Sequence, residues 1–217
     1  MSGDSEITAG GVEGRLERLR DAATTRPVAT AESAWVWIAE LAKRAKTDAA
    51  AAAAAECNEL FRLGVPPTNL DGPTDGILVM TTTNPAMDAA VRAVTGLWMP
   101  WQGKRFHSDE GTGDNRMTRS SRVVSKLLWP LYSMRDAVDG KLAFDFKTYI
   151  EAGKDDPDRQ VMVIDYANVE SNPRLAIRSV RDELVQLVDG VYLGKILYRT
   201  GSDKYSNIGY FALRAQG

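Results

Sequence analysis

Two charged residues, Lys195 and Asp165, lie within stretches of sequence that are otherwise apolar and rich in β-branched residues. Side chains alternate between the two faces of a β-strand, so Lys195 shares a face with Val191 and Leu193, and Asp165 shares one with Val163. An unpaired charge in an apolar interior costs several kcal/mol, so each side chain needs a partner. We therefore expect a buried structural ion pair, a lysine that reaches the rim of a barrel, or a polar contact inside a ligand cavity.

Aromatic residues recur along the same part of the chain and could line such a cavity. They gather at 98–106 and 129–132, each time beside a proline, which favours a position near the mouth of a barrel. Most aromatic residues fill a core whether or not a ligand is bound. The residues predicted to contact a ligand are Trp98, Trp101, Lys104, Tyr132, Phe146, Tyr149, Asp165, Tyr192 and Lys195.

The other residues that could take part in chemistry favour structural roles. His107 is the single histidine, whereas a metal site needs several convergent ligands, so a surface or capping role is predicted. The glycine-rich stretch 111–115 lacks the Lys-Ser/Thr ending of a phosphate loop and is predicted to be an ordinary turn. Cys57 lies beside Glu56 and Glu59, and these carboxylates disfavour the thiolate, so an inert thiol is predicted. We expect neither a metal nor a cofactor.

The composition limits the class of protein. The 217 residues include 27 Lys and Arg and 29 Asp and Glu, so the net charge of -2 provides no basic surface for nucleic acid. One cysteine excludes an intramolecular disulfide and fits a reducing cytoplasm. The N-terminal segment lacks the pattern of a signal peptide, and no stretch approaches the roughly 20 apolar residues of a membrane span. We predict a cytoplasmic protein without integral membrane association.

The first part of the chain is predicted to be helical. A first helix is expected from about Val12 to Ala23 because leucines recur on one face. A second helix, capped by Thr30, is expected to continue through the alanine tract 49–55, since alanine has the highest helix propensity. Gly64 is expected to end it as the residue after the last helical turn.

The rest of the chain reads as short strands separated by turns. Strands are predicted at 77–83, 97–107, 126–135, 142–150, 160–166, 191–199 and 208–214, the last two as a hairpin. A helical turn is expected at 85–94, and apolar spacing predicts a helix over 173–188, with an irregular extended strand as the alternative. The predicted fold is therefore α+β: a flexible tail over 1–14, a helical arm over 15–64, and an antiparallel β-barrel domain over 65–217.

Four segments carry a resemblance to known proteins: 101–106 (WQGKRF), 144–149 (FDFKTY), 182–186 (DELVQ) and 189–195 (DGVYLGK). Together they resemble a family of uncharacterised actinobacterial proteins, over roughly residues 58–217. The first segment is also similar to small barrel-like proteins named for a G-x-W-x-x-G motif, and the last resembles the closing strand of lipocalin-like, or calycin, barrels. The resemblance implies a barrel that holds an apolar ligand.

The leading hypothesis is a binding protein for an apolar small molecule, such as a lipid, a steroid or a polyketide-like compound, with a carboxylate or carbonyl head group. The alternative is a cofactor-independent isomerase, cyclase or lyase. In that enzyme Asp165 or His107 would move a proton, while Lys195, Arg178 or a tyrosine would stabilise an oxyanion.

A third hypothesis concerns the helical arm. Trp35 and Trp37 lie on nearly opposite faces of their helix, so the arm could dock a partner or a second copy in a homodimer.

Overall fold

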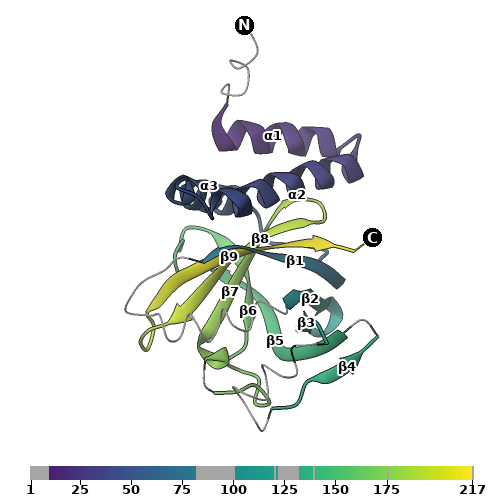
Figure 1. Ribbon diagram of the computed structural model, residues 1–217, viewed down its shortest axis with the longest axis vertical. Coiled ribbons are helices and arrows are strands. Elements are labelled where there is room, and N and C mark those ends of the chain that lie inside the picture. Colours follow the sequence, from purple (N-terminus) through teal and green to yellow (C-terminus); the bar gives the residue numbers. More distant parts are fainter. Residues whose placement is uncertain are drawn as a thin grey trace, which may run out of the picture.

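The computed structural model describes residues 10–81, 101–119, 121, 132–138, 140–174 and 176–216. It begins with three helices, which Figure 1 shows stacked on one side of a β-barrel. They are α1 (Gly11–Ala23), α2 (Pro27–Arg44) and α3 (Ala50–Leu63). The predicted helical turn at 85–94 and most of the predicted strand at 126–135 lie outside the described residues.

The helical arm differs in one respect from the prediction of two helices. Instead of one helix from Thr30 to Gly64, the chain forms α2 and α3 with a break between Arg44 and Ala50. Thr47 lies in the break: its hydroxyl donates to the Arg44 carbonyl at 2.8 Å and accepts from the Ala49 amide at 3.2 Å. Such local side-chain hydrogen bonds compete with the helical ladder, which explains the break.

The barrel consists of antiparallel strands that close on themselves. The strands are β1 (Gly72–Thr81), β2 (Trp101–His107), β3 (Thr112–Met117), β4 (Arg135–Ala137), β5 (Gly140–Ala152), β6 (Gln160–Asp165), β7 (Val180–Val188), β8 (Val191–Arg199) and β9 (Tyr205–Ala215). Their order is β3-β2-β1-β9-β8-β7-β6-β5-β4, and pairing of β3 with β5 closes an eight-stranded barrel with the short β4 beside it. The predicted α+β fold, a helical arm followed by an antiparallel barrel, is confirmed.

The helix predicted over 173–188 does not form, and the alternative of an extended strand is what the structure shows over 180–188. A single 3-10 turn, η3 (Ile177–Ser179), leads directly into β7, and every residue of β7 except Gln186 is buried. A strand that is buried on both faces has no alternation of apolar and polar residues, so its apolar residues can also match a helical period. Strand β3 was not predicted either, because its residues overlap the glycine-rich stretch interpreted as a turn.

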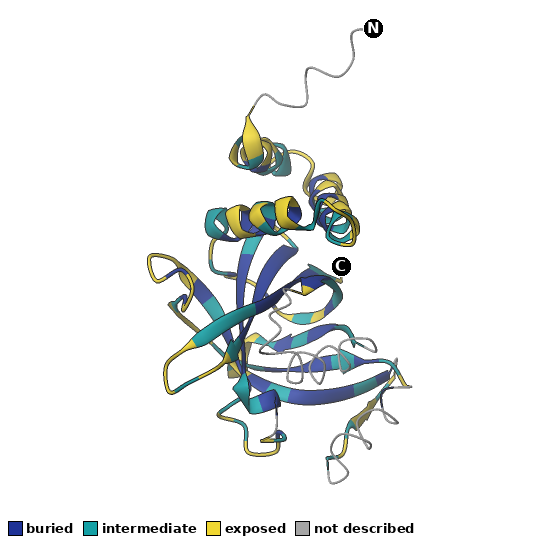
Figure 2. Ribbon diagram, turned by 60° about the vertical axis from the view of Figure 1, so that its left-hand side comes forward, coloured by how far each residue is buried: buried dark blue, intermediate teal, exposed yellow. Residues whose placement is uncertain are grey.

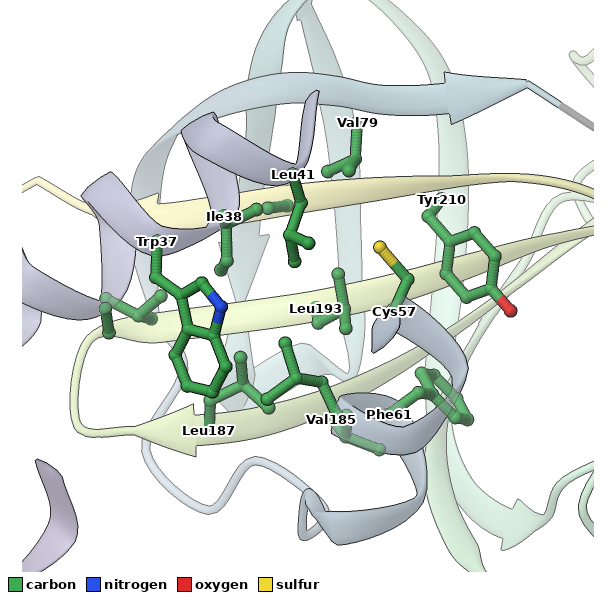
Figure 3. Packing of buried hydrophobic residues seen from close by; sticks show 14 of the residues in the cluster. Trp37, Ile38, Leu41, Cys57, Phe61, Val79, Val185, Leu187, Leu193 and Tyr210 are labelled. Carbon is green, nitrogen blue, oxygen red and sulfur yellow. The ribbon is translucent and has the colours of Figure 1, made fainter. Parts of the chain in front are cut away.

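Both faces of the barrel wall are apolar on the side next to the helices. One cluster fills the inside of the barrel and includes Phe106, Phe146, Ile164, Leu184 and Phe211. The other lies between the helices and the outer surface of β1, β7, β8 and β9, where Figure 3 shows Trp37, Ile38 and Leu41 over Val79, Val185 and Leu193. Buried residues therefore occupy both sides of the strands beneath the arm (Figure 2).

Gly64 joins the arm to the barrel. It ends α3 as predicted, but its φ of -71° is ordinary, so a left-handed conformation is not what requires glycine. A β-carbon at this position would lie 2.4 Å from Cγ2 of Val185 in β7. The next residue, Val65, pairs with Gln186. The close approach of the chain to β7 is the reason for glycine at this position.

Candidate functional site

A cluster of polar side chains lies inside the barrel, with Lys104 at its centre. A bulge between Trp101 and Gly103 in β2 changes the alternation of the strand, so that Trp101 packs against the same interior cluster as Phe106. Gly103 adopts a φ of +145°, and a β-carbon there would lie 2.1 Å from the Thr74 carbonyl oxygen of β1. The bulge needs glycine on both grounds.

Lys104 forms an ion pair with Asp182 of β7. The distance from Nζ to Oδ2 is 2.9 Å, and neither side chain is exposed to solvent. The Lys104 ammonium also donates to Asn115 Oδ1 at 3.0 Å and to the Tyr166 hydroxyl. An ammonium has three N–H groups, so these three acceptors can use all of them.

Asn115 and Tyr166 link the remaining members of the cluster. Trp101 Nε1 donates to Asn115 Oδ1 at 3.1 Å, and Asn115 Nδ2 donates to the Phe144 carbonyl at 3.0 Å. The Tyr166 hydroxyl donates to Asp182 Oδ2 at 3.0 Å. The second carboxylate oxygen, Asp182 Oδ1, is buried and has no hydrogen-bond partner in the part of the chain that the structure describes.

The backbone beside the cluster is held in an uncommon conformation. Phe144 has a φ of +52°, which is rare for a bulky residue and carries a conformational cost. Its amide donates to the Tyr132 hydroxyl at 2.6 Å, and the two rings stack with 5.0 Å between centroids. These contacts fix the Phe144 carbonyl where Asn115 donates to it.

Aromatic rings surround the ammonium, and burial shifts the pKa of its side chain and of Tyr166. Lys104 Nζ lies 5.2 to 5.3 Å from the ring centroids of Phe146, Tyr166 and Phe211. Burial lowers the pKa of Lys104 from its usual value, and the Asp182 carboxylate opposes that shift. Burial, aided by the charge of Asp182, raises the pKa of Tyr166 well above 10, so its hydroxyl stays neutral and remains a donor.

The predicted ligand-contacting residues divide into several groups. Trp101, Lys104, Phe146 and Tyr192 lie in the interior or pack against it, and Tyr132 is partly buried against the same cluster. Tyr149 is 42 % exposed. Asp165 and Lys195 lie on the outer face of the wall, and Trp98 is outside the described residues. For the residues that lie in the interior or pack against it, a role in binding remains a prediction.

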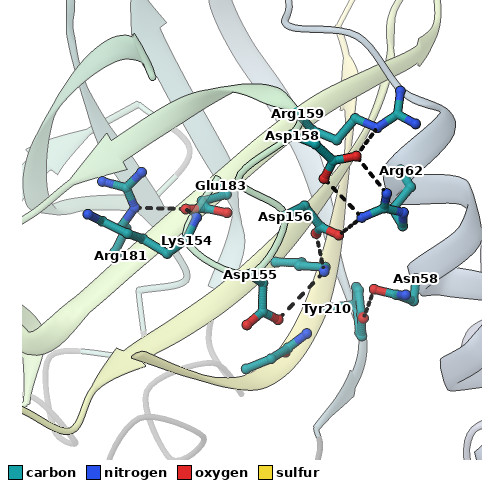
Figure 4. Close-up of polar contacts among 12 residues, drawn as sticks. Asn58, Arg62, Lys154, Asp155, Asp156, Asp158, Arg159, Arg181, Glu183 and Tyr210 are labelled. Atoms are coloured by element: carbon teal, nitrogen blue, oxygen red, sulfur yellow. Dashed lines mark hydrogen bonds and ion pairs between the residues drawn. The ribbon is translucent and has the colours of Figure 1, made fainter. Parts of the chain in front are cut away.

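Lys195 shares a face with Val191 and Leu193, and this face does not point into the barrel. That face packs under the helices instead, and Lys195 Nζ lies 2.6 Å from Asp156 Oδ2 and 4.8 Å from the Phe61 ring centroid of α3. Figure 4 shows that Asp156 also contacts Arg62 of the same helix. The structural ion pair, which was one of the three expectations, is what the structure shows.

Asp165 also has its hydrogen-bond partners on the outside of the barrel. It follows Val161 and Val163 on the face that packs toward the helices, and its carboxylate accepts from the Ala167 amide at 2.7 Å and from Asn168 Nδ2 at 2.5 Å. Strand β7 separates it from Lys195. The structure therefore does not bring Asp165 and Lys195 into one interior cavity.

His107 lies at a pocket on the outside of the wall, opposite the helices. Its Nε2 atom is 3.7 Å from Asp114 Oδ2, and Arg105 contacts the same carboxylate at 2.7 Å. The pocket has a volume of about 470 Å³ and is also lined by Arg135 and Asp145. Burial raises the pKa of Asp145, and the nearby Arg135 opposes that shift.

Asn115, Tyr166 and Asp182 were not among the residues predicted from the sequence. Strand alternation would have placed Tyr166 on the face of Ile164, and Asp182 on the face of Val180 and Leu184, if 180–188 had been assigned as a strand. Asn115 gave no such signal, because it lies in the glycine-rich segment that looked like a turn.

Comparison with known proteins identifies no relative: no family model, no curated protein and no solved structure matches the chain. Within the described ranges, no helix is both long enough and apolar enough to cross a membrane. The same residues contain no group of three or more His, Cys, Asp or Glu side chains arranged to hold a metal ion.

Proposed function

We propose that this protein binds an apolar small molecule inside its barrel and that Lys104, Asp182, Asn115 and Tyr166 hold the polar end of that molecule. The observation that carries the proposal is the charged, fully buried cluster within an aromatic interior. Binding sites for small molecules are mostly apolar and contain a few convergent polar groups that fix the orientation of the ligand. The resemblance to calycin barrels supports the same class of function.

Stability alone does not account for the cluster. A buried ion pair is often replaceable by apolar side chains of similar volume without loss of stability, because desolvation offsets the attraction between the charges. The barrel already has an extensive apolar interior, including Phe106, Ile164 and Leu184. Two opposite charges at its centre are therefore better explained by recognition of a ligand than by a need of the fold.

The proposal is tested by native mass spectrometry and thermal shift with a panel of lipids, steroids and polyketide-like compounds. We expect the parent protein to retain or gain an apolar compound, and Lys104→Met to lose it. Lys195→Met is the matched control, because it removes a buried lysine from the outer face of the same barrel. An empty parent protein with no thermal shift across the panel would contradict the proposal, as would equal retention by Lys104→Met and the parent.

A further inference from the structure

We infer that the polar end of the bound molecule is a neutral hydrogen-bond donor, a hydroxyl or an N–H group, and that it donates to Asp182 Oδ1. This inference rests on the proposed function, and it names the chemical class of the ligand. The head group that the sequence suggested, a carboxylate or a carbonyl, depended on an inward-facing Lys195, which the structure places outside the barrel.

The donors of the cluster are directed to acceptors within it, but one acceptor is left over. Lys104 directs its ammonium to three described acceptors, on Asp182, Asn115 and Tyr166. The Tyr166 hydroxyl and the Asn115 amide donate within the cluster as well. The polar atom left over is an acceptor, Asp182 Oδ1, which is buried and has no partner in the described ranges. A carboxylate oxygen without a hydrogen bond in an apolar interior is costly, so a donor from the ligand would relieve that cost.

The charges of the cluster also favour a neutral group on the ligand. Lys104 and Asp182 neutralise each other at 2.9 Å, so the pair leaves no net charge for an anionic head group. A carboxylate brought beside Asp182 would lose its hydration and also meet a like charge in a medium of low dielectric constant. A cation would place a second positive charge close to Lys104 under the same conditions. A neutral donor avoids both costs.

The position of Asp182 in β7 suits contact with a ligand inside the barrel. Asp182 belongs to β7, and its side chain lies between Val180 and Leu184 on the face that points into the barrel. The aromatic rings of Phe146, Tyr166 and Phe211 near Lys104 would contact the apolar part of a ligand whose donor reaches the carboxylate. The cluster therefore selects an amphipathic molecule with a single buried hydroxyl or N–H group.

The test compares three probes that differ at the polar end: 1-dodecanol, its isomer undecyl methyl ether, and dodecanoate. The ether retains an oxygen acceptor but lacks the donor. Dissociation constants are measured by equilibrium dialysis against the full chain. A hydrogen bond to a charged group predicts that the alcohol binds roughly tenfold or more tightly than the ether, and that dodecanoate binds more weakly than the alcohol.

The role of the carboxylate is tested with Asp182→Asn, in which the preference for the alcohol over the ether should fall to less than about threefold. Because that variant leaves Lys104 without its counter-charge, the double variant Lys104→Met with Asp182→Asn is measured beside it. Asp114→Asn is the matched control: Asp114 is another buried aspartate with an unpartnered oxygen, but it lines the outer pocket. The control should keep the full preference.

The outcomes separate the two proposals. Equal binding of the alcohol and the ether, or tightest binding of dodecanoate, overturns the donor inference and leaves the binding function standing; equal binding would mean that a water molecule satisfies Asp182. A preference that survives Asp182→Asn and the double variant overturns it as well. If none of the three probes binds, both the inference and the proposed function are overturned for single-chain lipids.

Discussion

Lys104 and Asp182 form an ion pair inside the barrel, with 2.9 Å between Nζ and Oδ2 and no solvent exposure of either side chain. A second lysine, Lys195, is almost equally buried but lies on the opposite face of the wall, 2.6 Å from Asp156. The two pairs differ in surroundings: the first is enclosed by aromatic rings, and the second has Arg62 of α3 as a further partner. They should therefore respond differently to the same substitution.

Lys104→Met should lower the free energy of unfolding by about 3–5 kcal/mol, because it leaves the Asp182 carboxylate buried without a counter-charge. Adding Asp182→Asn should recover most of the loss, since the double variant contains no buried charge at this place. Urea unfolding of the parent, the two single variants and the double variant gives the coupling energy directly. Additive losses in the double variant would contradict the ion pair.

Lys195→Met should cost less, about 1.5–3 kcal/mol, because Asp156 keeps its contact with Arg62 when the lysine is removed. The same variant should leave ligand binding unchanged, since its side chain does not reach the interior. The double variant Lys195→Met with Arg62→Met should lose more unfolding free energy than the sum of the two single losses, because Asp156 then has no cation. Urea unfolding checks the two stability losses, and ligand retention measured on the same preparations checks the unchanged binding. Weaker ligand binding in Lys195→Met would show that the outer face influences the site.

The sequence predicts the architecture better than it predicts the site. Strand β8 runs from Val191 to Arg199 as its apolar and β-branched residues predict, and Lys195 shares a face with Val191 and Leu193. Whether this face points into or out of the barrel could not be predicted, because the helical arm makes the outer face of this wall as apolar as the inner one. Strand periodicity determines which residues lie together, whereas the packing of other elements determines which face is the inside.

The interior cluster could not be predicted from the sequence, for a related reason. Lys104 is among the residues predicted to contact a ligand, but its partner Asp182 lies in a segment whose apolar residues fit a helix as well as a strand. Asn115 reaches the cluster from β3, and Tyr166 lies just after β6. Asn115 is paired with Lys104 directly between β2 and β3, whereas the closure of the barrel brings Asp182 and Tyr166 across to it.

Buried tyrosines should make the protein sensitive to alkaline pH. Burial raises the pKa of Tyr132 and of Tyr192 to about 12 and also raises that of Tyr166, whereas tyrosines in the unfolded chain ionise near 10. The folded state therefore holds more protons than the unfolded state above pH 10. Stability should be unaffected by these groups at lower pH and should fall as the pH rises from about 10 to 12, by about 1.4 kcal/mol per pH unit for each tyrosine.

The measurement is a spectrophotometric titration of tyrosinate alongside circular dichroism. The absorbance change of the buried tyrosines should coincide with the loss of secondary structure rather than precede it. Full ionisation while the barrel remains folded would show that these hydroxyls are accessible.

Gly194→Ala should disturb both the fold and the site. Gly194 pairs with Phe211 across β8 and β9, and a β-carbon at this position would lie 2.2 Å from the Phe211 ring. The ring must then move, yet it packs edge-on against Trp101 with 5.9 Å between centroids and lies 5.2 Å from Lys104 Nζ. Overpacking of this kind costs about 1–3 kcal/mol, and the displaced ring should also weaken binding of an apolar ligand.

Gly201→Ala, in the turn between β8 and β9, is the matched control, because the nearest atom to its β-carbon, Lys204 Cβ, is 3.5 Å away. The control should remain within about 0.5 kcal/mol of the parent in urea unfolding, and equal stability of the two variants would mean that Phe211 has room to move.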